Sequence, residues 1–85
     1  TLEAAAVIAD GYRAILIDAF ERQRQQVGGE AVVLDAVVEI AAEHGYPGGI
    51  WAARQLLEQC GEFIVQAGPS GRLTVRRGGF SSAVG

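Results

Sequence analysis

The sequence predicts a small α+β domain in which three helices are followed by a C-terminal β-hairpin. Apolar residues recur at three- and four-residue steps through most of residues 2–60, which is typical of amphipathic helices. The pattern changes to an alternation of period two over residues 62–67 and 72–77, which indicates strands. With 85 residues and a hydrophobic content of 49%, the chain is long enough to build one core. We therefore expect one domain over residues 1–77 and a linker or frayed tail over residues 78–85.

The first predicted helix covers residues 2–26 and is stopped by the glycine pair that follows Val27. Its apolar surface is wider than one stripe, because Ile8, Ile15 and Ile17 flank the main apolar face on both sides. A helix of this kind either lies deep in its domain or presents a second face to another molecule. The N-terminal helix is therefore a candidate surface for a homodimer.

The second predicted helix covers residues 30–44 and is closed by Gly45. Asp35, Glu39 and Glu43 recur every four residues and form an acidic ridge on one face. The β-branched residues at the start of this segment make a strand conceivable over residues 31–34. The acidic spacing nevertheless favours a helix throughout.

The third predicted helix covers residues 49–60, after a glycine-rich turn. Its apolar side, on a wheel stepped at about 100° per residue, consists of Ile50, Ala53, Leu56, Leu57 and Cys60. Its polar side consists of Trp51, Arg54, Gln55, Glu58 and Gln59. We expect the three helices to share a core made of Leu16, Phe20, Val37, Ile40, Ile50 and Leu57.

The predicted hairpin pairs residues 62–67 with residues 72–77 across a Gly-Pro-Ser-Gly loop. Alternation directs one set of side chains inward, namely Phe63, Val65, Leu73 and Val75. Arg72 and Arg76 fall on the opposite face, and Arg77 follows at the end of the strand. Three arginines within six residues also protect an edge strand from pairing with other chains, so a purely structural role is the alternative.

Charge is divided unevenly along the chain. The formal net charge is −3, but residues 1–45 carry −5 and residues 46–85 carry +2. An overall negative charge therefore does not exclude a local basic surface. All seven basic residues are arginine, and together with the many alanines and glycines this indicates a GC-rich, bacterial genome.

Several function classes find no support in the composition. The single Cys60 cannot form an intramolecular disulfide, no Cys/His cluster has metal-ligand spacing, and a reducing, cytoplasmic setting is expected. No apolar run is long enough to span a membrane. No nucleophile is paired with a base, so we expect neither an enzyme nor a cofactor.

The order of helix, turn, helix and basic hairpin over residues 30–77 resembles the winged-helix family. The resemblance implies binding of double-stranded DNA, with helix 49–60 as the recognition helix and hairpin 62–77 as the wing. The resemblance implies that two sets of residues contact the DNA. These are Trp51, Arg54, Gln55 and Gln59 in the helix, and Arg72, Arg76 and Arg77 in the wing. Arginine and glutamine are side chains that can form hydrogen bonds with base edges, and wing arginines can contact phosphates.

Trp51 leaves a second function open. On the wheel it lies on the polar face, where a large aromatic side chain is typical of a contact surface. A phase error of one position would instead place it in the core. If exposed, Trp51 and the N-terminal helix would suit a protein–protein module that docks onto the rest of a parent protein or onto a protein partner.

Overall fold

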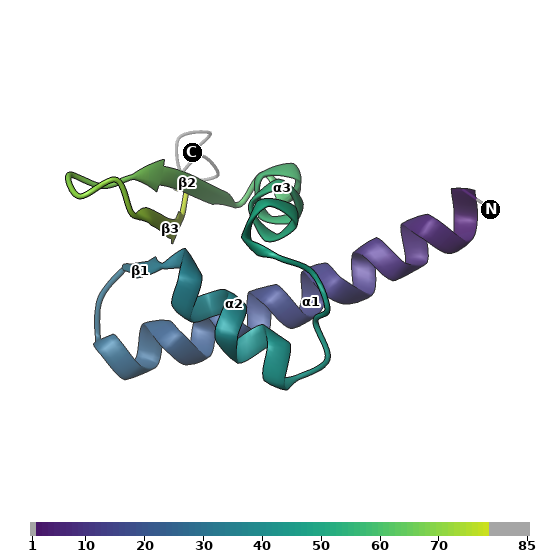
Figure 1. The fold of residues 1–85 in the computed structure, drawn as a ribbon, viewed down its shortest axis with the longest axis horizontal. Coiled ribbons are helices and arrows are strands. Elements are labelled where there is room, and N and C mark those ends of the chain that lie inside the picture. Colours follow the sequence, from purple (N-terminus) through teal and green to yellow (C-terminus); the bar gives the residue numbers. More distant parts are fainter. Residues whose placement is uncertain (1, 79–85) are drawn as a thin grey trace, which may run out of the picture.

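The computed structural model describes residues 2–78, which form three helices and one sheet (Figure 1). The elements are α1 (Leu2–Val27), β1 (Ala31–Val33), α2 (Leu34–Glu43), α3 (Ile50–Cys60), β2 (Phe63–Ala67) and β3 (Leu73–Arg77). The predicted α+β class is confirmed at this level. Apart from Gly78, the tail predicted over residues 78–85 lies outside the described residues.

The helix predicted over residues 30–44 is wrong at its start, because Ala31–Val33 form strand β1 and α2 begins at Leu34. β1 pairs antiparallel with β3, and the side chain of Val32 is buried opposite Val75. The acidic spacing of four that favoured a helix begins only at Asp35, inside α2. Burial of a β-branched side chain against β3 therefore decides the conformation of these three residues.

The sheet has three strands in the order β1-β3-β2, so the hairpin is not a free two-stranded wing. The predicted pairing of β2 with β3 is confirmed, with Val65 opposite Val75. Phe63, Val65 and Val75 are buried as predicted, whereas Leu73 is half-buried. A third strand matters because an isolated hairpin is at best marginally stable in water.

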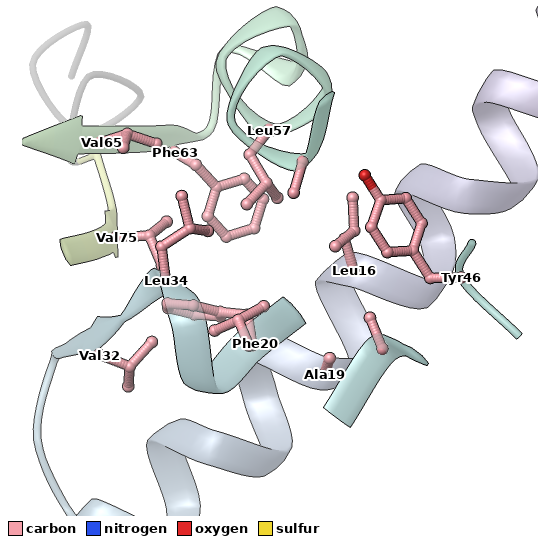
Figure 2. Packing of buried hydrophobic residues seen from close by; sticks show 13 residues of the cluster. Leu16, Ala19, Phe20, Val32, Leu34, Tyr46, Leu57, Phe63, Val65 and Val75 are labelled. Atoms are coloured by element: carbon pink, nitrogen blue, oxygen red, sulfur yellow. The ribbon is translucent and has the colours of Figure 1, made fainter. Parts of the chain in front are cut away.

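The core lies where α1, α2, α3 and the inner face of the sheet meet (Figure 2). Four of the six residues predicted for it are fully buried, namely Leu16, Phe20, Val37 and Leu57. Ile40 and Ile50 are only partly buried and pack against its margin. The sequence therefore predicted correctly which face of each helix is turned to the core. Only the depth of burial of Ile40 and Ile50 was overestimated.

Tyr46 fixes the turn between α2 and α3. Its ring is buried and contacts Tyr12 of α1 edge-on, with the ring centroids 5.8 Å apart. Its hydroxyl donates a hydrogen bond to the carbonyl oxygen of Gly49, at 3.0 Å. A Cβ atom at Gly48 would lie 2.5 Å from the Tyr46 hydroxyl oxygen, closer than such contacts tolerate. A glycine is thus required at position 48, and the turn sets the direction in which α3 leaves.

No helix among residues 2–78 combines the length and the apolar content needed to cross a bilayer.

The fold predicts opposite outcomes for two truncations in α3. Leu57→Ala removes a fully buried side chain, so the free energy of unfolding should fall by about 2–5 kcal/mol. Trp51→Ala removes a side chain that is 68% exposed, so the same quantity should change by less than about 0.5 kcal/mol. Urea denaturation followed by far-UV circular dichroism measures both. A larger loss for Trp51→Ala than for Leu57→Ala would contradict the packing described above.

Candidate nucleic-acid interface

The solvent-facing side of α3 carries the four residues predicted from the helix wheel. Trp51, Gln55 and Gln59 are exposed, and Arg54 is partly exposed. On the opposite side of the helix, Ala53 and Leu57 are buried. Of the two interpretations of Trp51, the structure supports the exposed one. The indole is therefore available for contact with another molecule.

The side chain of Arg54 contacts two other residues of its own helix. Its Nε atom is 3.4 Å from a carboxylate oxygen of Glu58, one turn further on. Its guanidinium carbon lies 5.8 Å from the centroid of the Trp51 ring, which is within the range of a cation–π contact. Both contacts are at the surface and weak, so little free energy holds Arg54 in place. The side chain is therefore free to adopt other conformations.

Gln59 lies at the contact between α3 and α1. Its side-chain oxygen accepts a long hydrogen bond of 3.5 Å from Nη2 of Arg13. Arg13 also donates from Nε to the carbonyl oxygen of Leu56, at 3.3 Å, and from Nη1 to Asp10, at 2.6 Å. No local pattern in the sequence of α1 singles out Arg13, because nothing in α1 alone shows that α3 packs beside it. This arginine connects α1 to the last turn of α3.

Arg72 and Arg76 lie on the outer face of the sheet, the face turned away from the core. Arg72 is exposed and Arg76 is half-buried. Neither forms an ion pair with any residue in the described part of the chain. In contrast, each of the other five arginines has a carboxylate partner. The uncompensated positive charge of the domain is therefore concentrated on this face.

Arg77 is separated from the other two wing arginines, because β3 alternates and Arg77 shares the inner face with Val75. Its Nε and Nη2 atoms donate to Oε2 of Glu21, at 3.0 and 2.7 Å, and its Nη1 atom donates to Glu62, at 3.0 Å. The guanidinium carbon lies 5.7 Å from the Phe20 ring centroid and 5.2 Å from that of Phe63. The alternation of side chains along a strand is enough to predict that Arg77 points inward. Its charge is balanced locally, unlike that of Arg72.

The arginines of this cluster shift the pKa of the Glu21 carboxylate. The hydrogen bonds from Arg77, and next those from Arg24, lower the pKa of Glu21 below its ordinary value of 4.5. The same contact with Glu21 raises the pKa of Arg77. Both shifts favour the charged pair. The ion pair therefore belongs to the folded state and joins α1 to the end of β3.

A surface depression of about 480 Å³ lies beside this cluster. It is lined by Phe20, Glu21, Arg24, Glu30, Arg76 and Arg77. Its three arginines face two lining glutamates and Glu62, which binds Arg77, so the depression has no excess positive charge. No sequence pattern predicts this depression, since its walls come from α1, β3 and the loop before β1.

Among residues 9–78, no group of three or more His, Cys, Asp or Glu side chains is placed to hold a metal ion. The half-buried Cys60 is a free thiol at the end of α3. No family model, curated protein or solved structure matches the chain. Any inference about function therefore rests on the geometry of the outer sheet face and of α3.

The Glu21–Arg77 pair predicts a pH-dependent stability. Because the pKa of Glu21 is lowered in the folded state, its contribution is complete above about pH 4.5 and is lost as the pH falls through the lower folded value. The melting temperature of the wild type should therefore exceed that of Glu21→Gln at pH 7, and the difference should shrink on acidification to about pH 2.5.

Glu43→Gln is the matched control, since Glu43 is exposed on α2 and forms no ion pair with any side chain of residues 9–78. Its melting temperature should follow that of the wild type at every pH. A difference between Glu21→Gln and the wild type that is unchanged from pH 7 to pH 2.5 would contradict the ionic origin of the stabilisation.

Proposed function

We propose that this domain is a non-catalytic DNA-binding module of a larger bacterial protein, with α3 as the recognition helix and the β2–β3 hairpin as a basic wing. The observation that carries the proposal is the position of Arg72 and Arg76. They share one face of the sheet and lack the carboxylate partners that every other arginine has. Such unpaired cations are suited to phosphate contacts.

The arrangement of the elements supports a winged-helix assignment. The chain keeps the order of helix, short turn, helix and hairpin on which the resemblance rests, and α3 presents a polar face to solvent. β1 adds a third strand on the far side of β3. Pairing on both sides of β3 holds the strand that bears the arginines more firmly than a hairpin would.

In this proposal, one set of residues supplies the affinity for DNA and another supplies the preference for particular bases. Arg72 and Arg76 would contact phosphates, which supplies a salt-dependent attraction common to all sequences. Gln55 is exposed in the middle of α3 and suits adenine, while Arg54 suits guanine once it leaves Glu58. With only two unpaired wing arginines, we expect weak binding in the non-specific range of about 10⁻⁴–10⁻⁶ M.

The wing can be tested by charge removal at two places. Arg72→Gln combined with Arg76→Gln should weaken binding to all duplexes alike and reduce the slope of log affinity against log salt by up to about 0.9 per lost phosphate contact. Arg22→Gln is the control, because it removes one positive charge, against two in the wing variant, from a residue that is paired with Asp18 on α1. It should leave the slope unchanged.

Fluorescence anisotropy of a labelled duplex at low salt measures these affinities. If about 100 μM of the domain binds no duplex, a concentration at the weak end of the usual non-specific range, the DNA proposal is wrong. If the wing variant and Arg22→Gln weaken binding equally for each charge removed, the attraction depends on net charge and the wing has no specific role.

A protein-docking function is the second candidate, and the exposure of Trp51 favours it. Tryptophan is among the residues that dominate the binding energy of protein interfaces, and this indole is 68% exposed. The described turns of α1 that extend beyond the other elements in Figure 1 could dock on the same parent protein. A contact anchored by an aromatic side chain depends little on salt, in contrast to a phosphate contact.

Trp51 can report which surface binds, because it is the only tryptophan in the chain. If α3 enters a DNA groove, tryptophan emission should change during titration with duplex, with the same midpoint as the anisotropy. N-acetyl-tryptophanamide in the same duplex solutions corrects for absorption by the DNA. Binding that leaves the emission unchanged would restrict the contact to the wing and leave Trp51 for a protein partner.

A further inference from the structure

Strand β2 forms one edge of the sheet, because the strand order is β1-β3-β2 (Figure 1). Two hydrogen bonds fix which of its backbone groups point toward β3. The amide of Gly78 donates to the carbonyl of Glu62, and the amide of Gly68 donates to the carbonyl of Arg72. Hydrogen-bonded pairs alternate along an antiparallel ladder. The even-numbered residues of β2 therefore bond with β3.

The odd-numbered residues Phe63, Val65 and Ala67 consequently direct their backbone N–H and C=O groups away from β3, toward the open edge. None of these groups forms a backbone hydrogen bond outside the β2–β3 pair among the described residues. The strand itself, Phe-Ile-Val-Gln-Ala, contains neither a charge nor a proline. Natural edge strands usually carry such features to prevent pairing with other chains.

We propose that two copies of this chain associate through β2, which pairs antiparallel with itself around a two-fold axis at Val65. In this register Val65 faces Val65 of the second copy, and Phe63 faces Ala67. Phe63, Val65 and Ala67, whose backbone groups point to the open edge, then all lie in hydrogen-bonded pairs, each of which exchanges two hydrogen bonds. A five-residue strand satisfies all of its edge backbone groups in this way only because the backbone groups of its central residue point to that edge.

The charges at the ends of the strand complement one another in the same register. Glu62 of one copy falls opposite Gly68 of the other, and Gly68 pairs with Arg72 on the neighbouring strand. Glu62 and Arg72 of the second copy are then two strands apart, or about 9.6 Å. No side chain lies between them, since the residue in the middle is glycine. Long side chains span that separation, so Arg72 of the second copy adds a second positive charge near Glu62, which already pairs with Arg77 of its own copy at 3.0 Å.

The resulting dimer has a continuous six-stranded sheet, with Arg72 and Arg76 of both copies on its outer face. Pairing of five residues on each side buries less surface than a stable dimer interface. We therefore expect weak association, with a dissociation constant on the order of 0.1–1 mM for the isolated domain. The proposal does not depend on DNA binding and uses a surface other than α1.

Ala67→Pro tests the register without disturbing the ladder to β3. It removes an outward-facing amide, whereas the amide of Gly68, which does bond with β3, is kept. Sedimentation equilibrium from about 0.02 to 2 mM, which brackets the expected dissociation constant, should show a monomer–dimer equilibrium for the wild type. The dissociation constant of Ala67→Pro should be raised about tenfold or more. Ala67→Ser keeps the amide and should behave as the wild type does.

Hydrogen exchange resolves the same contact residue by residue. Protection of the amides of Phe63, Val65 and Ala67 should increase with protein concentration, while the amides of Ile64 and Gln66 stay protected throughout. Circular dichroism confirms that Ala67→Pro remains folded. A monomer at 2 mM, a dimer that Ala67→Pro leaves intact, or protection of the odd-numbered amides that is independent of concentration would each overturn the proposal.

Discussion

The edge-on contact between Phe20 and Phe63 is the interaction on which the rest of this structure depends. Their ring centroids lie 5.1 Å apart, and the contact joins α1 to the first residue of β2. Arg77 covers both rings and is held by Glu21, the residue after Phe20. Because a small sheet needs a covered apolar face to be stable, this cluster fixes where the sheet lies on the helices.

The same cluster explains why the arginines of β3 differ in role. Neighbouring residues of a strand point to opposite faces, so Arg77 is directed to the core side and Arg76 to the outer side. On the core side, Arg77 meets a carboxylate from α1 and two aromatic rings. On the outer side, none of the helices described in residues 2–78 covers the strand. The burial of one face thus leaves Arg72 and Arg76 as the uncompensated charges.

Net charge is a poor guide to what this domain binds. Most of its carboxylates and five of its arginines lie on the helices or at the helix–sheet junction, where several neutralise one another in ion pairs. On α3, Arg54 and Glu58 cancel within one turn beside an exposed Trp51. An aromatic ring with an adjacent cation suits a nucleobase and a peptide alike. The outer face of the sheet therefore discriminates better between the two candidate functions than α3 does.

The sequence by itself determined the features that depend on local periodicity. These are the three helices, the phase of α3 that exposes Trp51, and the hairpin with Phe63, Val65 and Val75 turned inward. The tertiary structure decided what depends on distant partners. Residues 31–33 are compatible with either helix or strand, and pairing with β3, more than forty residues later, makes them a strand. Arg77 finds Glu21 across 56 residues of chain. A repeat of two or 3.6 residues encodes which side of an element is apolar. It contains no information about which sides come together, because that is settled by the packing of the whole core.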